Sequence, residues 1–234
     1  MLLAGQKVVV VGGSSGIGLS TAELAKSEGA DVTIASRNAE RLKAAAEKLG
    51  VKSMPADVTS DESVAQLFQQ CGMVNHVVVT AAQLRTGPFK TVPMEDVRAT
   101  MEAKFWGAWR VARAAQIKPG GSLTLVSGFL SVRPRPAAAI VGATNGALES
   151  LARSLALELA PVRVNAISPG IIDTPMMDRF SGGTDEGRAR VIAQEPVGRM
   201  GKPEEIASAV LWLCSDAAAF MVGHAMVMDG GQTA

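Results

Sequence analysis

The sequence predicts one α/β domain, a doubly wound parallel sheet of seven strands flanked by helices. Short runs rich in β-branched residues alternate with longer helical patterns along all 234 residues, which is typical of parallel strands joined by right-handed helical crossovers. The first run, Lys7–Val11, is almost wholly apolar, as in a strand covered on both faces. The length suits one substantial core, so residues 1–234 are expected to form a single domain.

The expected elements follow in chain order. Strands are predicted over Lys7–Val11, Asp31–Ala35, Lys52–Pro55, His76–Val79, Ser122–Val126, Val162–Ile167 and Ala225–Met228. Helices are predicted over Gly16–Glu28, Ala39–Leu49, Ser60–Gln70, Met94–Ile117, Ala143–Leu159 and Glu204–Cys214. The Pro119-Gly120-Gly121 run is typical of a turn. Residues 170–202 are rich in Gly, Pro, Met and charge, and this irregular segment is predicted to form a lid.

Composition excludes several classes of function. Basic and acidic residues nearly balance, 23 against 22, so nothing indicates binding to nucleic acid or to an anionic membrane. The chain shows no secretory signal pattern and no apolar stretch long enough to cross a bilayer. Two cysteines and two histidines, scattered along the chain, do not form a metal-binding pattern. We therefore expect a cytoplasmic protein without a metal.

A glycine-rich segment, Gly12-Gly13-Ser14-Ser15-Gly16-Ile17-Gly18, lies between the first strand and the first helix. Glycines there permit a tight turn and a close approach of the backbone to a pyrophosphate, which the helix N-terminus then attracts. A glycine cluster alone is a weak signal. Its place directly after a buried strand, opening a helix, predicts a dinucleotide site of the Rossmann type.

Further motifs resemble those of the short-chain dehydrogenase/reductase family, in particular its 3-oxoacyl-carrier-protein reductases. They are the glycine motif itself, Ala56-Asp57-Val58-Thr59, Ser168-Pro169-Gly170 with Ile172-Asp173-Thr174, Arg199–Ala207 and Met228-Asp229-Gly230-Gly231. The resemblance runs from Gln6 to Gly231. It implies that Asp57 and Val58 lie beside the adenine of a dinucleotide and that the Ser168–Thr174 loop contacts its nicotinamide.

The choice of cofactor depends on the end of the second strand, which reads Ile34-Ala35-Ser36-Arg37-Asn38. No carboxylate is present there for a ribose 2′-hydroxyl, whereas an arginine suits a 2′-phosphate. We therefore expect NADP(H) in preference to NAD(H), although Arg37 could also be a solvated charge at a strand end. The expected cofactor-binding residues are Gly12, Ser14, Ser15, Gly16, Ile17, Gly18, Arg37, Asp57, Val58, Ala81, Asn145, Pro169, Gly170, Ile172 and Thr174.

The resemblance also identifies four positions at which this chain departs from the family, whose chemistry uses an Asn, a Ser, a Tyr and a Lys. Here the Tyr position holds Val141, the Ser position holds Gly128, the Lys position holds Asn145 and the Asn position holds Lys104. The protein contains no tyrosine at all, so no shift of the alignment restores the phenol. The proton donor of the family is therefore missing.

Lysine and asparagine look exchanged between two helices. We hypothesise that Lys104 points into the cofactor cleft, where it supports cofactor binding or acts as an unusual acid, with Asn145 beside it. The alternative is that Lys104 faces solvent and replaced Asn by drift. Ser127 is a third candidate catalytic residue, although its position is more typical of a hydrogen bonder at a strand end.

Two further groups of residues are each consistent with two interpretations. Ser131, Arg133 and Arg135 follow the fifth strand, where substrate usually lies in the family, and the arginines could recognise an anion or simply stiffen a surface loop. Trp106, Trp109 and Trp212 could be subunit contacts of a homodimer or homotetramer, or ordinary core residues.

Two functions are consistent with these features. The first is an oxidoreductase that uses NADPH to reduce a small carbonyl compound or enone at a non-standard site. The second is a catalytically silent protein that binds NADP(H) as a sensor or as a partner subunit.

Overall fold

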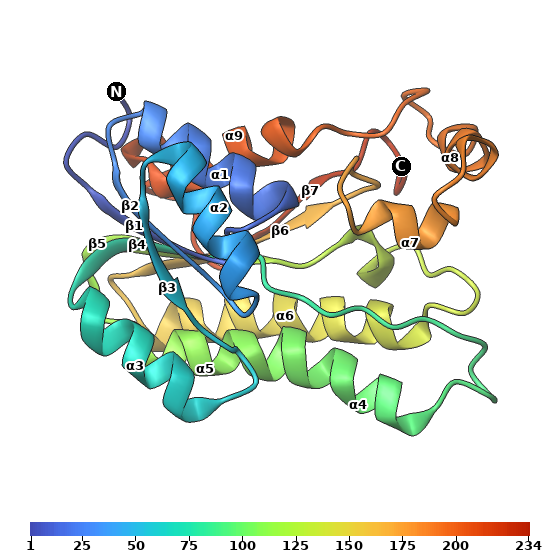
Figure 1. Cartoon of the computed structure of the whole chain (residues 1–234), viewed down its shortest axis with the longest axis horizontal. Coiled ribbons are helices and arrows are strands. Elements are labelled where there is room, and N and C mark those ends of the chain that lie inside the picture. The colour runs from blue at the N-terminus through green and yellow to red at the C-terminus, as the bar shows by residue number, and fades with distance from the viewer.

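The computed structural model describes residues 1–234, except for the side chains of Arg179 and Phe180. Its centre is a seven-stranded parallel sheet with the strand order β3-β2-β1-β4-β5-β6-β7 (Figure 1). The strands are β1 Lys7–Val11, β2 Asp31–Ser36, β3 Lys52–Pro55, β4 Val74–Val79, β5 Ile117–Val126, β6 Arg163–Pro169 and β7 Ala225–Met228. The predicted doubly wound fold is confirmed.

Helices cover both faces of this sheet. On one face lie α1 Gly16–Ser27, α2 Ala39–Leu49 and α9 Pro203–Cys214, and on the other lie α3 Asp61–Cys71, α5 Gly107–Ala114 and α6 Ala139–Glu158 (Figure 1). Each layer has its own apolar core. In β1, Val9 packs in the core beneath α3, α5 and α6, whereas Val8 and Val10 pack in the core beneath α1, α2 and α9. A strand buried on both sides needs this continuous apolar run.

The long helix predicted over Met94–Ile117 is interrupted and ends early. It consists of α4 Met94–Met101, a π-helical turn over Glu102–Trp106, and α5, which ends at Ala114. Positions 119–121, where a turn was predicted, lie within β5 but outside its register with β4. Ile117 pairs with Val74 and Ser122 pairs with His76, so residues 118–121 form an irregularity between the two pairs. Gly120 has a φ of +79° there, which favours glycine. The local turn signal therefore corresponds to an interruption within the strand rather than to its end.

Two other boundaries also differ from the prediction. Helix α6 begins at Ala139, four residues before the expected Ala143. No side chain caps its first turn, so the sequence carries no local signal for this start. The segment 170–202, predicted to be irregular, contains α7 Met177–Ser181 and α8 Asp185–Ile192. The Thr184 side chain caps α8 by accepting a hydrogen bond from the backbone N–H of Gly187.

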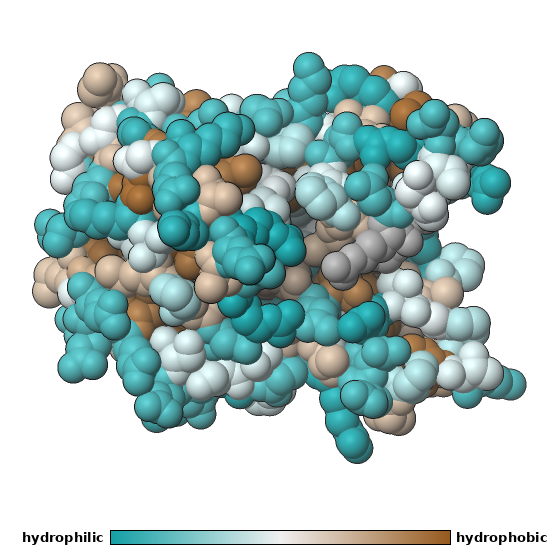
Figure 2. Space-filling view, viewed as in Figure 1, coloured by the Kyte–Doolittle hydropathy of each residue, from teal (hydrophilic) through white to brown (hydrophobic). Residues whose placement is uncertain are grey.

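The three tryptophans lie at the surface rather than in the core. Trp106 and Trp109 are each 43% exposed and pack edge to face with one another, and Trp212 is 37% exposed. Ordinary core packing therefore does not explain them. Elsewhere, hydrophilic side chains cover most of the face in Figure 2, with apolar patches between them.

Within the part of the chain that the structure describes, no helix is long and apolar enough to cross a membrane. Among the same residues, no three histidine, cysteine or acidic side chains come together as a metal site would require.

Candidate active site

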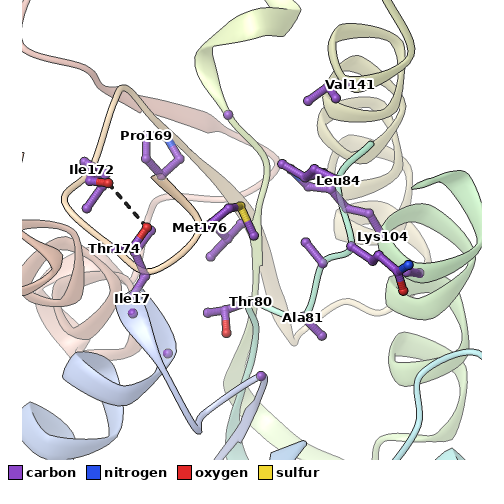
Figure 3. Close-up of a pocket in the computed structure, with 18 of the residues that line it drawn as sticks. Ile17, Thr80, Ala81, Leu84, Lys104, Val141, Pro169, Ile172, Thr174 and Met176 are labelled. Carbon is purple, nitrogen blue, oxygen red and sulfur yellow. Dashed lines mark hydrogen bonds between the residues drawn. The ribbon is translucent and has the colours of Figure 1, made fainter. Parts of the chain in front are cut away.

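A cavity of about 740 Å³ opens at the carboxyl ends of the central strands. Parallel α/β sheets bind their ligands at this edge. Every residue that we expected to contact a cofactor lines this cavity, from the glycine loop at one end to Asn145 and Thr174 at the other. Figure 3 shows the part where Ile17, Ala81, Lys104, Pro169 and Thr174 surround the same space.

The glycine loop leaves no room for side chains. A Cβ at Gly12 would lie 2.6 Å from the backbone N of Ala81, and one at Gly18 would lie 2.5 Å from Thr80 Oγ1. Gly16 has a φ of +52°, which favours glycine. Ser15 precedes α1 without a capping hydrogen bond from its side chain, so the first N–H groups of the helix remain available. The loop and the helix end therefore fit a pyrophosphate.

Replacing Gly18 by alanine is expected to lower the free energy of unfolding by about 2 kcal/mol and to weaken NADPH binding, because the new methyl group displaces the loop. Chemical denaturation and a cofactor titration measure the two effects. The matched control is Gly146→Ala on α6, where a Cβ meets no atom within 4 Å, so neither quantity should fall. Equal behaviour of the two variants would contradict the close fit of the glycine loop.

At the other end of the loop, Arg37 and Arg41 line the cavity where β2 ends. Asn38 caps α2 by accepting a hydrogen bond from the backbone N–H of Arg41 at 2.8 Å. The Ser36 hydroxyl is buried and finds no hydrogen-bond partner among the described residues. Asp57 accepts bonds from the Thr59 N–H and hydroxyl at 2.9 and 2.8 Å, and so shapes the turn after β3.

Lys104 lies inside the molecule at the chemical end of the cavity. Its side chain is carried by the π-helical turn and is only 5% exposed, so it is not a solvent-facing residue. Its ammonium donates hydrogen bonds to the carbonyl oxygen of Ser127 at 2.7 Å and to Asn145 Oδ1 at 2.6 Å. Burial lowers the pKa of Lys104 to about 7, and the nearby Glu149 carboxylate opposes this shift.

Asn145 and Glu149 connect Lys104 to the loop after β5. Asn145 Nδ2 donates to the carbonyl oxygen of Gly128 at 3.0 Å. Glu149 Oε1 accepts from the hydroxyls of Ser127 at 2.9 Å and Ser131 at 2.7 Å. Sequence reasoning missed Glu149. Its spacing was the available signal, because it follows Asn145 by one helical turn and lies on the same face of α6.

An apolar wall surrounds Val141, which the sequence resemblance assigns to the position of the family's tyrosine. Val141 on α6 is buried and lines the cavity together with Leu84 and Met176 (Figure 3). Met177 of α7 and Val191 of α8 also contribute, so the 170–202 segment closes part of the cavity. None of these side chains can donate a proton.

Comparisons with known proteins identify the family. Residues 11–233 match the family model described as enoyl-(acyl carrier protein) reductase. The chain is 31% identical to the 3-oxoacyl-[acyl-carrier-protein] reductase FabG of Thermotoga maritima, over 99% of both chains. It is also 31% identical to the peroxisomal 2,4-dienoyl-CoA reductase of Danio rerio, over 98% of this chain and 82% of that one.

A solved structure supports the same assignment. A short-chain type dehydrogenase/reductase from Mycobacterium ulcerans superposes with a TM-score of 0.93 at 28% identity, over 100% of this chain and 91% of that one. The chain therefore belongs to the short-chain dehydrogenase/reductase family of NAD(P)-dependent oxidoreductases.

Proposed function

We propose that this protein is an NADP(H)-dependent reductase of activated carbon–carbon double bonds, with a non-standard active site. The observation that carries the proposal is the buried amine of Lys104, held at the chemical end of the cavity beside an apolar wall. The site retains a positive charge although the phenol of the family is absent. We therefore regard the site as rearranged rather than simply lost.

Arg37 supports the preference for NADP(H) over NAD(H). Its side chain lines the adenine end of the cavity, next to Arg41 and the unpartnered hydroxyl of Ser36. These groups offer charge and hydrogen bonds to a 2′-phosphate, and no acidic side chain at the end of β2 competes for them. When bound, the dinucleotide would supply a hydride.

The missing proton donor favours an enone over a simple ketone as substrate. Reduction of an isolated carbonyl places charge on one oxygen, which must be protonated in the same step. Hydride addition to an enone spreads that charge over a conjugated system, so proton transfer can follow later. The apolar side chains of Leu84, Val141 and Met176 suit an unsaturated substrate. The names of the matching family model and of the dienoyl-CoA reductase support the same substrate class.

Lys104 would provide the charge for this reaction. Protonated, it has three N–H groups, two of which are bonded to Ser127 and Asn145. The third would then be available to the cavity that Lys104 lines. Because the pKa lies at about 7, the ammonium loses its proton as the pH rises through that value. Turnover that depends on the charge is therefore expected to fall above pH 7.

The test compares an enone with its saturated ketone, 4-phenyl-3-buten-2-one with 4-phenyl-2-butanone, by following the oxidation of NADPH. We expect turnover of the enone alone. Lys104→Met should lower that turnover about tenfold and remove its decline above pH 7. The control is Lys90→Met, because Lys90 is an exposed lysine outside the cavity. If Lys104→Met matched the wild type in cofactor affinity, rate and pH profile, the role of Lys104 would be refuted.

The second candidate function is a silent NADP(H) sensor or partner subunit. The specific observation in its favour is that Val141 occupies the phenol position in a chain without tyrosine. Saturable quenching of tryptophan fluorescence by NADPH, without turnover of either ketone or enone, would favour this function.

We also propose that the chain forms a homodimer or homotetramer. The half-exposed Trp106 and Trp109 support this, because aromatic side chains are enriched at subunit interfaces. Sedimentation equilibrium measures the assembly state directly.

A further inference from the structure

Arg135 is an arginine of the cavity whose guanidinium N–H groups make no hydrogen bond among the described residues. Arg135 lies on the loop between β5 and α6 and lines the cavity together with Phe129 and Leu130. Its guanidinium carbon stands 5.1 Å from the centre of the Phe129 ring, which supports the plane of the group. The guanidinium donates no hydrogen bond to any atom of the residues that the structure describes.

Glu195 is the acidic neighbour of Arg135, and it forms an ion pair with the arginine without a hydrogen bond. The nearest distance, from Arg135 Nη2 to Glu195 Oε1, is 3.8 Å, which is too long for a hydrogen bond. The same oxygen already accepts a hydrogen bond from Gln232 Nε2 at 2.7 Å. Burial of the Glu195 carboxyl raises its pKa, and the charge of Arg135 has the opposite effect.

The other arginines near this end have different surroundings. Arg133, two residues earlier, donates a hydrogen bond to the carbonyl oxygen of Gln232 and does not line the cavity. Arg85 does line the cavity, but its side chain is 49% exposed and pairs with Asp96 at 3.6 Å. Arg133 therefore fixes the loop, and Arg85 belongs to the rim. Among the described arginines at this end of the cavity, only Arg135 combines a supported guanidinium plane with donors that make no hydrogen bond to a described residue.

The surroundings of Arg135 have the character of a mixed subsite. Leu130 and Val141 lie along the same cavity and offer apolar contact, whereas the guanidinium offers two parallel N–H donors. The uncapped start of α6 at Ala138 adds positive potential to this region. A ligand that matches both parts has an apolar body and a planar anion at one end.

We propose that Arg135 determines substrate specificity by binding a carboxylate on the substrate, so that the natural substrates are acids that carry an activated double bond and an apolar body. The inference rests on the proposed function only in taking this cavity as the substrate site. Recognition would be bidentate, from the fork of Arg135 to the two carboxylate oxygens.

The test measures binding without turnover. The protein, saturated with NADP⁺, is titrated by calorimetry with 3-benzoylpropionate and with its methyl ester, which differ by one charge. We expect the carboxylate to bind about tenfold more tightly than the ester, and Arg135→Gln to abolish that preference while leaving ester binding unchanged. Arg135→Lys should keep part of the preference, because it retains the charge but not the fork.

Arg85→Gln is the matched control, since it removes one charge from the same cavity. The preference for the carboxylate should survive in it. If Arg85→Gln and Arg135→Gln reduced the preference equally, or if acid and ester bound alike to the wild type, specific recognition by Arg135 would be refuted. Failure of the proposed reductase function is seen separately, as an absence of NADPH oxidation with an enone while the binding preference persists.

Discussion

The variant that combines Lys104→Asn, Gly128→Ser, Val141→Tyr and Asn145→Lys is expected to reduce simple ketones at least about a hundredfold faster than the natural protein. The expected gain in rate comes from the proton donor that the tyrosine restores. Val141 already lines the cavity on α6, so a phenol there would face the space in which substrate binds. A positioned proton donor typically accelerates such reactions by about 10²–10⁴-fold. NADPH oxidation with 4-phenyl-2-butanone measures the gain.

The four changes must be made together. A Cβ at position 128 would lie 2.9 Å from Nδ2 of Asn145, so Gly128→Ser alone would displace the amide that holds Lys104. Asn145→Lys alone would place a second amine against Lys104. Single reversals are therefore expected to be inactive or destabilised. The control for the phenol is the same combination with Val141→Phe, which restores the ring without the hydroxyl. A natural protein as active on ketones as the tyrosine variant would contradict a disabled carbonyl-reducing site.

Charge reversal at Arg37 is expected to change cofactor preference most strongly. In Arg37→Glu, the ratio of NADPH affinity to NADH affinity should fall about a hundredfold, because the carboxylate repels a 2′-phosphate and accepts a bond from a 2′-hydroxyl. Titrations of tryptophan fluorescence with each nucleotide give the ratio.

Two further variants separate this effect from general electrostatics. Arg37→Gln should weaken NADPH binding without strengthening NADH binding. Lys43→Glu reverses an exposed charge on α2, outside the cavity, and should leave the ratio unchanged. If Lys43→Glu shifted the ratio as far as Arg37→Glu, Arg37 would have no specific role in selecting the cofactor.

The sequence predicted the strand, the glycine loop and the helix at one end of the cavity well because their signals are local. A buried strand, a glycine loop and a helix start follow one another directly, and each needs only its neighbours to form. The parallel direction of the strands also follows from their alternation with helices. The same local reasoning failed for Ile117, which was expected at the end of a helix but pairs with Val74 at the start of β5.

The chemical end could be predicted only in part. The resemblance located Lys104 and Asn145 on separate helices, but their contact depends on how those helices pack. The hydrogen bonds that Ser127 and Ser131 donate to Glu149 depend on the course of the loop after β5, which no local sequence pattern predicts. The difference between Arg133 and Arg135 likewise follows from the position of Gln232, which is distant from both in the sequence.

The π-helical turn under Lys104 affects how related sequences should be compared. A π turn is equivalent to one residue inserted into an α-helix, and each residue rotates the helix by roughly 100°. A relative without the π turn would have one residue fewer in this helix, so an alignment that places no gap there would match residues that point in different directions. The hydrogen bond from Lys104 to Asn145, rather than the alignment column, is therefore what identifies equivalent positions in this helix.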